Sequence, residues 1–370
     1  CFEVKSDKTR GVSEPTLEKS LKGAKDSFVE TIRVNTALVR RRICSPKLKV
    51  VESTVGRKSA TRVAVMFVEG VAPPETVREL ARRLDTLDVD GLLSVGLLEE
   101  GIVDAPASPF PQLVHTERPD RFAMYLLDGR VGLLVDGIPV GLVVPVTFAE
   151  FMRVTSDTNF HFLVTTVIAV LRYFSLMLSA LLPALYVAVA MYHQEMIPTR
   201  LLLSIIEAKQ DVPFSTALEV IGMLVAFALL QEAGLRLPNP IGDTVSIIGA
   251  LIVGQSAVEA RVVSPIAIIV VALSGIACYT LPSQDMGSAV RLVRFVLVIA
   301  AIAAGLFGVA AATCLVVFLL ARMDSFGLNY TAPLSEGMPG GLLRLFVRLP
   351  KRRDKYRDPL VGSPDRRRQG

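Results

Sequence analysis

The stretch Tyr173–Tyr192, YFSLMLSALLPALYVAVAMY, contains no charged residue along its whole length. As a helix, about twenty apolar residues at about 1.5 Å each span the roughly 30 Å hydrocarbon core of a bilayer. Further apolar segments follow at 213–231, 241–260, 262–282 and 295–321. A soluble protein buries one such helix in its core, but it does not bury several in succession. We therefore predict an integral membrane protein.

Charge is distributed unevenly along the 370 residues. Residues 1–160 alternate basic and acidic groups, as soluble domains do, whereas 51% of the whole chain is hydrophobic and its mean hydropathy is +0.50. This contrast predicts an α/β soluble N-terminal domain followed by an α-helical multi-span membrane domain. The expected parts are a polar N-terminal remnant, the soluble domain, a membrane domain with four or five apolar helices, and a basic C-terminal tail: 1–24, 25–160, 161–325 and 326–370.

Periodicity outlines the soluble part. Apolar residues at near-helical spacing predict a helix from Asp26 to Ile43, and Asp136-Gly137 predicts a tight hairpin turn, because this pair supports positive φ. The other expected elements are two strands, a helix, an irregular or helical stretch, a second helix, and the two strands of the hairpin: 47–54, 61–68, 74–87, 88–100, 119–127, 131–135 and 140–144. The chain begins at Cys1 without an initiator methionine, and we expect it to be a fragment.

Sequence motifs of enzymes and metal sites are absent. There is no HExxH, GxSxG, Walker loop or CxxC pair, and the three histidines are scattered. The charged cluster Thr116–Asp120 fits the start of a helix with a local ion pair better than a ligand site. The net charge of +5 lies largely at the two ends, which favours anionic lipid over nucleic acid. We expect no enzyme activity, cofactor, metal or nucleic-acid partner.

Ionisable residues inside the apolar block are more informative, because intramembrane charge is costly and usually faces a bundle interior or a water-filled path. The block carries Glu219, Glu232, Arg236, Asp243, Glu259, Arg261, Arg291 and Arg294. We predict an ion path formed by Glu219, Glu232, Asp243, Gln255 and Glu259. Segment 241–260 also carries a stripe of small residues for helix packing: Ser246, Ala250, Gly254 and Ala257. The alternative is that Glu259 only pairs with Arg261 or Arg236 at the membrane boundary.

Ordered motifs between residues 23 and 335 resemble those of the GerA-type spore germination protein A subunit family. They are Gly23–Phe28, Arg33–Arg42, Ser108–Pro111, Thr116–Asp120, Gly129-Arg130 with Val135–Gly137 and Pro139, Leu182–Tyr186, His193–Thr199, Glu232–Pro238 and Gly249–Gln255. The sequence departs from the family pattern at its shortened N-terminus and at Val140, where an aromatic residue is usual. A paralogous branch of the SpoVA group shares these motifs and stays open as an alternative.

The resemblance implies a subunit of a nutrient germinant receptor in the spore inner membrane. It implies a transporter-like B subunit and a lipoprotein C subunit as partners, and a homo-oligomer that forms a ligand-gated ion channel. A secondary transporter is the alternative, although no internal repeat is apparent, and a structural scaffold would leave Glu219 and Glu259 unexplained. The basic segments at both ends predict cytoplasmic termini, hence an even number of crossings. One of five apolar segments must then fail to cross, and 241–260 is the candidate.

Overall fold

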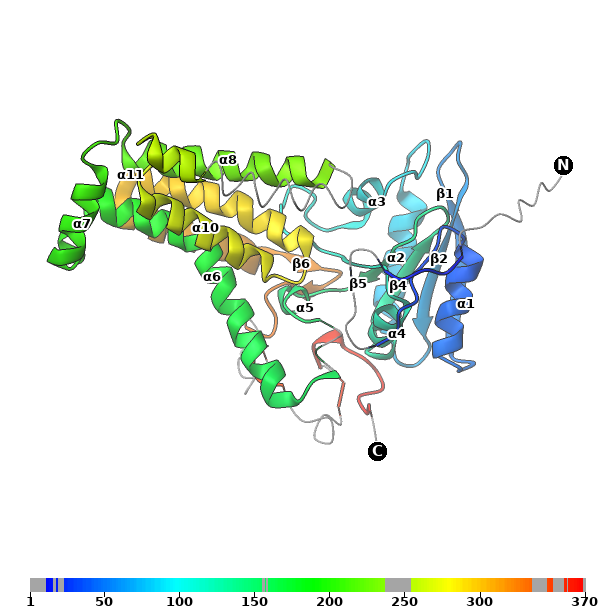
Figure 1. The fold of residues 1–370 in the computed structure, drawn as a ribbon. Helices are drawn as coiled ribbons and strands as arrows, with labels where there is room; N and C mark the ends of the chain where they lie inside the picture. Colours follow the sequence, from blue (N-terminus) through cyan, green and yellow to red (C-terminus); the bar gives the residue numbers. More distant parts are fainter. Residues whose placement is uncertain are drawn as a thin grey trace. The chain divides into compact units, whose positions relative to one another are not determined.

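The computed structural model describes residues 11–15, 18, 23–154, 157, 159–236, 254–334, 345–348, 356–357 and 359–368. The chain divides into two compact units (Figure 1). The first consists of Cys1–Val170 together with Leu320–Gly370 and is called the soluble unit below. The second, Leu171–Leu319, is called the membrane unit.

A five-stranded antiparallel sheet forms the centre of the soluble unit, in the order β1-β2-β4-β5-β3. The strands are β1 (Leu48–Val55), β2 (Thr61–Val68), β3 (Val114–Thr116), β4 (Val131–Val135) and β5 (Gly141–Val144). The predicted hairpin is confirmed, since β4 pairs with β5 and places Val131 opposite Val144. Its turn contains Gly137 with φ of 84°, the positive angle expected for Asp-Gly.

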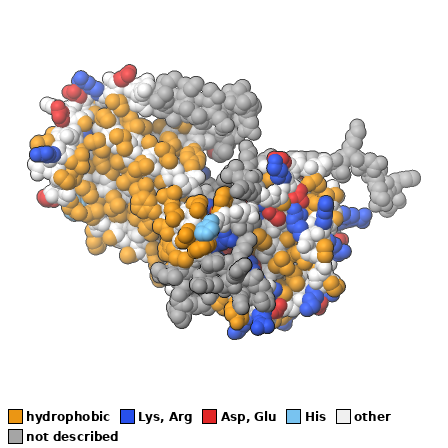
Figure 2. All heavy atoms as spheres, turned by 60° about the horizontal axis from the view of Figure 1, so that its bottom comes forward, with side chains coloured by type: hydrophobic (Ala, Val, Ile, Leu, Met, Phe, Trp, Pro, Cys, Tyr) orange, Lys and Arg blue, Asp and Glu red, His pale blue; other side chains and the backbone are white. Residues whose placement is uncertain are grey.

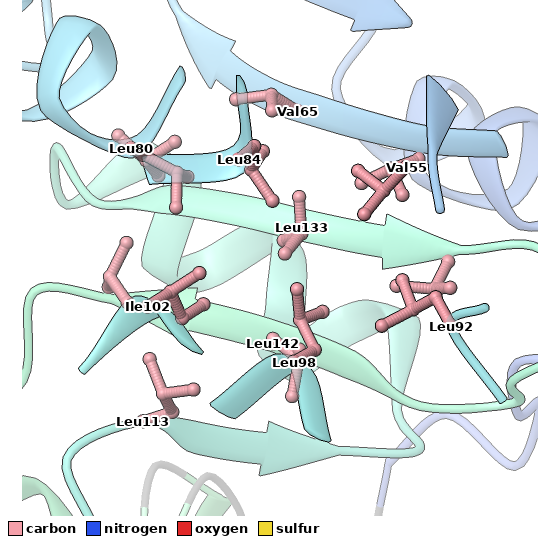
Figure 3. Close-up of a cluster of buried hydrophobic side chains, with 14 of the residues drawn as sticks. Val55, Val65, Leu80, Leu84, Leu92, Leu98, Ile102, Leu113, Leu133 and Leu142 are labelled. Carbon is pink, nitrogen blue, oxygen red and sulfur yellow. The ribbon is translucent and has the colours of Figure 1, made fainter. Parts of the chain in front are cut away.

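Helices cover both faces of this sheet because successive strand residues point to opposite sides. Apolar side chains of α2 (Pro74–Thr86) and α3 (Val95–Ile102) pack against the alternate sheet residues that include Val65 and Leu133 (Figure 3). On the other face lies Phe122 of α4 (Pro119–Leu127), whose ring occupies the space that a side chain at Gly132 would fill. This packing gives the soluble unit its own hydrophobic core.

The first helix, α1 (Ile32–Arg42), begins later than the predicted Asp26. The preceding residues are extended because other groups take their backbone hydrogen bonds. Phe28 donates its N–H to Glu117 O at 2.8 Å, and Val29 exchanges hydrogen bonds with the buried Asn35 side chain at 2.8 and 2.6 Å. Apolar spacing alone did not reveal these competing partners.

Residues after the last membrane helix return to the soluble unit. They form a short hairpin of β6 (Asp324–Ser325) and β7 (Leu328–Asn329), followed by the fully buried Tyr330. The Tyr330 hydroxyl donates to Pro111 O at 2.9 Å, and Phe148 N–H donates to Tyr330 O at 2.8 Å. Phe148 opens the short helix α5 (Phe148–Phe151), so the hairpin is part of the fold of this unit.

The basic C-terminal residues also contact the soluble unit. Ser363 Oγ donates to Val71 O at 2.6 Å, and Arg368 forms an ion pair with Asp128 at 2.6 Å. At least one basic residue of this tail therefore forms an ion pair within the soluble unit.

The membrane unit is helical. Its main elements are α6 (Phe162–Tyr192, which begins in the soluble unit), α7 (Thr199–Lys209), α8 (Thr216–Arg236), α10 (Pro265–Tyr279) and α11 (Gln284–Arg322). Among the described residues, α6, α8 and α11 are long and apolar enough to cross a membrane, and α10 is a shorter apolar helix. Large apolar side chains such as Phe174, Leu229, Ile276 and Phe307 are exposed on this unit. Figure 2 shows hydrophobic side chains gathered over a broad part of the face in view. A surface of this kind suits contact with lipid.

Helix α11 contains a reversal that the sequence reading missed. Ala304 and Gly305 have non-helical dihedral angles, and φ of Gly305 is 58°. A Cβ built on Gly308 would overlap the carbonyl oxygen of Ala300, eight positions earlier in the chain. Residues with that spacing lie about 12 Å apart in a straight helix, so the two halves must fold back on each other. The apolar stretch 295–321 is therefore not one straight helix, because glycine permits a turn between two helical halves.

Helices α8 and α10 run in the same direction. The first turn of α8 contacts the beginning of α10, where Ser264 N–H donates to Glu219 Oε2 at 3.0 Å. Near their other ends, Gln231 Nε2 donates to the Tyr279 hydroxyl at 2.9 Å. The two helices are therefore parallel neighbours.

Candidate functional site: buried charge in the membrane unit

Glu219 is the predicted ion-path residue that the structure buries most completely, with 2% of its surface exposed. It lies in the first turn of α8, where the positive end of the helix dipole stabilises a carboxylate. Oε2 accepts from Ser264 N–H, and Ser264 is the N-cap of α10. The carboxylate therefore lies at the N-terminal ends of two parallel helices.

Lys209 supplies the opposite charge from the end of α7. Its Nζ lies 3.1 Å from Glu219 Oε1 and also donates to the Thr216 hydroxyl. Taking two charges out of water is costly, and it is tolerable here because each charge meets the other and a further polar partner. The buried Tyr186 hydroxyl of α6 lies near Ser264 and Glu219 and has no hydrogen-bond partner among the described residues, so residues of four helices meet in this cluster. We call Tyr186, Lys209, Thr216, Glu219 and Ser264 the Glu219 cluster.

Among the described residues, Glu232, Gln255 and Glu259 do not join this cluster. Glu232 is exposed near the end of α8, and it has a partner of its own. Gln255 and Glu259 lie on the helical stretch 254–259, and both are exposed. Residues four apart share one face of a helix, so these two side chains lie one turn apart as predicted. Asp243 lies outside the described residues.

Part of the alternative explanation for Glu259 is tested by its neighbours. Arg261 Nη1 lies 2.7 Å from Asp211 Oδ2, in an exposed ion pair. That arginine thus has a different carboxylate as its partner.

The predicted packing stripe is only partly within the described residues. Ser246 and Ala250 lie outside them. Ala257 packs against the apolar core of the membrane unit, but a Cβ at Gly254 would meet nothing within 4 Å. A close approach of backbone in this unit is found instead between Gly308 and Ala300.

Sequence reasoning missed Lys209, Ser264 and Tyr186 as partners of Glu219. Lys209 belongs to an amphipathic stretch that gave no sign of burial, and Ser264 and Tyr186 lie far away in the sequence. The Ser-Pro pair at 264–265 was the one available signal, because serine before proline at the first helical position marks a capped helix start.

The charged cluster of the soluble unit has the predicted local structure. Arg118 forms two hydrogen bonds with the carboxylate of Asp120, at 3.0 and 2.5 Å, where α4 begins. Arg118 N–H also donates to the Thr116 hydroxyl at 3.1 Å. The prediction of a helix start with an ion pair is confirmed. Among the described residues, no group of three or more His, Cys, Asp or Glu side chains is arranged to hold a metal ion.

A soluble α/β unit joined to a helical unit with exposed apolar helices and buried charge defines a membrane protein with a soluble domain. The chain matches the family described as Bacillus/Clostridium GerA spore germination protein over residues 1–360. It is 39% identical to the uncharacterized membrane protein YfkQ of Bacillus subtilis (strain 168), over 94% of this chain and 68% of that protein. It is 38% identical to spore germination protein B1 of the same organism, over 97% of this chain and 75% of that protein.

One similar solved structure is the N-terminal domain of the A subunit of the Bacillus megaterium spore germinant receptor GerK3. It is 38% identical in sequence and covers 33% of this chain and 97% of that chain, with a TM-score of 0.28. The family match covers most of the chain, and several relatives exceed 30% identity over more than two thirds of it. The chain belongs to the GerA spore germination protein family.

Proposed function

We propose that this chain is the membrane subunit of a spore germinant receptor that oligomerises into a nutrient-gated ion channel. One observation carries the proposal: Gln255 and Glu259 form a polar helix face that is exposed on the isolated chain. Within a membrane, a polar face requires water or a neighbouring protein surface. A second copy of the chain would supply the protein surface, and the path enclosed between the copies would supply the water. The proposed partners are a transporter-like B subunit and a lipoprotein C subunit.

The arrangement of helices supports an even number of crossings. In this proposal α6, α8, the return between α8 and α10, α10, and the two halves of α11 make six passes. An even number puts both flanks of the membrane unit on one side, which suits the packing of the hairpin at 324–329 in the soluble unit. The crossing between α8 and α10 is part of the proposal alone, since residues 237–253 lie outside the described residues, and it replaces the expectation that 241–260 fails to cross.

The proposed location is the spore inner membrane with both termini in the cytoplasm. Residues 351–370 contain eight Lys or Arg residues against three Asp residues, and basic flanks favour the cytoplasmic side. Asp365→Cys, in a chain whose natural cysteines are replaced, should resist a membrane-impermeant maleimide added from outside. Rapid labelling of this position in intact membranes would reject the orientation.

The experiment that tests the channel compares Glu259→Gln with Glu207→Gln. Glu207 is an exposed carboxylate on α7, and its loss controls for the change in net charge. The full receptor is reconstituted in liposomes, and K⁺ and Na⁺ fluxes are followed during addition of a panel of amino acids and sugars. Glu259→Gln should change conductance or selectivity, because a carboxylate at a pore mouth concentrates cations. Unchanged flux with normal assembly of Gly254→Leu would exclude this segment from the pore.

A secondary transporter is the competing function, and the interruption in α11 is the feature that bears on it. Transporters bind their ions where helices are broken near the middle of the membrane. Gly305 instead lies against Tyr192 and His193, where α6 ends. A break at that position serves as a turn between two passes, which favours the channel. Flux that is stoichiometrically coupled to a solute would favour the transporter.

A further inference from the structure

Helix α6 contains an internal proline, and a side chain of another helix replaces the hydrogen-bond donor that this proline lacks. Pro183 has no N–H, so the carbonyl of Ser179, four residues earlier, loses its partner within the helix. In an apolar environment such an unpaired carbonyl is costly. Arg294 of α11 donates from Nε to Ser179 O at 2.7 Å and from Nη2 to Ser179 Oγ at 2.6 Å.

Arg294 is buried, with 4% of its surface exposed. Its Nη2 also reaches Ser274 O of α10 at 3.2 Å, and the Cys278 thiol lies beside it. The guanidinium therefore joins α6, α10 and α11 through neutral acceptors. Arginine suits this position because its planar fork has donors pointing in several fixed directions. A lysine ammonium is a compact point charge with a shorter reach.

Helix α11 contains a break in its backbone hydrogen bonding, and a side chain of α6 supplies the missing donor. Non-helical angles at Ala304 and Gly305 interrupt the hydrogen bond that Ile302 O would otherwise accept from Leu306 N–H. The Tyr192 hydroxyl, at the end of α6, donates to Ile302 O at 2.5 Å. Each helix thus supplies the side chain that satisfies a carbonyl released in the other.

From this reciprocity we infer that Arg294 and Tyr192 are positioning residues that clasp α6 to the first half of α11. The two contacts hold α6 on both sides of its proline, at Ser179 and at Tyr192. The segment between them carries Ala184, Val187 and Ala188, which are fully buried in the core of the membrane unit. The clasp holds the residues around Pro183 against α11, and its release frees the stretch from Pro183 to Tyr192 to move away from α11.

The experiment follows the burial of position 188. Ala188→Cys is introduced into the full chain, whose natural cysteines are replaced, and labelling by a small maleimide is timed in reconstituted membranes. Arg294→Met should raise the labelling rate about tenfold or more, as expected when a buried acceptor loses its donor. Arg291→Met is the matched control, because Arg291 lies one turn away on α11 and contacts Gln231 Oε1 at 2.9 Å. Its labelling should stay within about threefold of the reference.

A rescue variant separates the clasp from simple loss of packing. Pro183→Ala restores an N–H to pair with Ser179 O, so Arg294→Met should accelerate labelling far less in this background. Equal acceleration with proline and with alanine at position 183 would overturn the inference, as would equal rates for the two Arg→Met variants. If Arg294→Met does not yield folded protein, recovery by Pro183→Ala supports the clasp and failure to recover rejects it. Arg294→Lys is then used for the labelling comparison.

Ion flux is recorded on the same preparations, and this readout rests on the proposed channel function. Release of the clasp should change the fraction of time that the channel conducts, with Pro183→Ala reducing the change. Absence of all flux, with the labelling pattern intact, would count against the channel and leave the clasp in place. Altered flux without any change at position 188 would reject the clasp as its cause.

Discussion

The soluble and membrane units each bury an arginine, and they compensate its charge differently. In the soluble unit Arg130 Nη2 lies 2.7 Å from Glu150 Oε1, and Nη1 donates to Pro145 O. In the membrane unit the hydrogen bonds of Arg294 go to Ser179 and Ser274, through two carbonyls and a hydroxyl. The charge of Arg130 is compensated by a carboxylate. The charge of Arg294 is compensated by neutral dipoles, one of which is the carbonyl that a proline leaves without its partner. Arg130 therefore stabilises a tertiary contact between charged groups, whereas Arg294 stabilises an irregularity in a helix.

The largest expected effect comes from removing the charge that Arg130 faces. Glu150→Gln should lower the free energy of unfolding of the soluble unit by about 3–5 kcal/mol, because it leaves a buried guanidinium without its counter-charge. Thermal unfolding of the full chain in detergent measures this. Asp90→Asn, which removes the exposed pair with Lys58, is the control and should have almost no effect. Similar losses for both variants would mean that burial of the Arg130 pair is unimportant.

The same carboxylate predicts a pH dependence. Burial of Glu150 works to raise its pKa, but the nearby charges of Arg130, Arg153 and Arg121 lower it below the ordinary value of 4.5. A carboxyl with a depressed pKa in the folded state contributes stability above its unfolded pKa and loses it as pH falls through the folded value. Stability should therefore decline as pH is lowered below about 4.5, and less steeply in Glu150→Gln. Parallel acid curves for the two proteins would contradict the lowered pKa.

Gly308 tests the corresponding irregularity in the membrane unit. A methyl group there would collide with the backbone carbonyl of Ala300, which cannot move aside as a flexible side chain does. Gly308→Ala should cost about 1–3 kcal/mol and separate the two halves of α11. Gly254→Ala is the matched control, since a Cβ there meets nothing within 4 Å. Cross-linking of paired cysteines across the halves reports the separation, and equal cross-linking in both variants would place the reversal elsewhere.

Local patterns predicted most of the soluble unit and the existence of the membrane helices. Alternating apolar residues and Asp136-Gly137 were enough for β1, β2 and the β4–β5 hairpin, because these elements depend on neighbours in sequence. The start of α1 was wrong because Phe28 and Val29 find partners outside any helix. Resemblance of ordered motifs, not composition, indicated the family.

In the membrane unit, the turn within α11 and the partner of Glu219 could not be predicted from the sequence. The apolar run 295–321 gives no sign of where it turns, because Gly305 and Gly308 look like ordinary small residues in an apolar helix. The burial of Glu219 was expected from the cost of intramembrane charge, but its partner Lys209 was not, since Lys209 lies outside every predicted apolar segment. Both misses concern tertiary contacts, of Gly308 with Ala300 and of Lys209 with Glu219, which helical periodicity does not encode even though the partners are close in sequence.

The smallest expected effect concerns the hairpin that ties the end of α11 into the soluble unit. Tyr330→Phe removes one hydrogen bond, to Pro111 O, and keeps the ring that packs beside Phe148 and Phe151. Because the acceptor is then left buried without its donor, the loss should be about 1 kcal/mol. Tyr356→Phe, at an exposed tyrosine of the same C-terminal region, should change nothing. Hydrogen exchange at the Phe148 amide, which donates to Tyr330 O, is the sensitive measurement, because it reads the local opening of this contact. Faster exchange in Tyr330→Phe alone would show that the hydroxyl holds the hairpin in place, whereas equal exchange in both variants would assign that role to the ring.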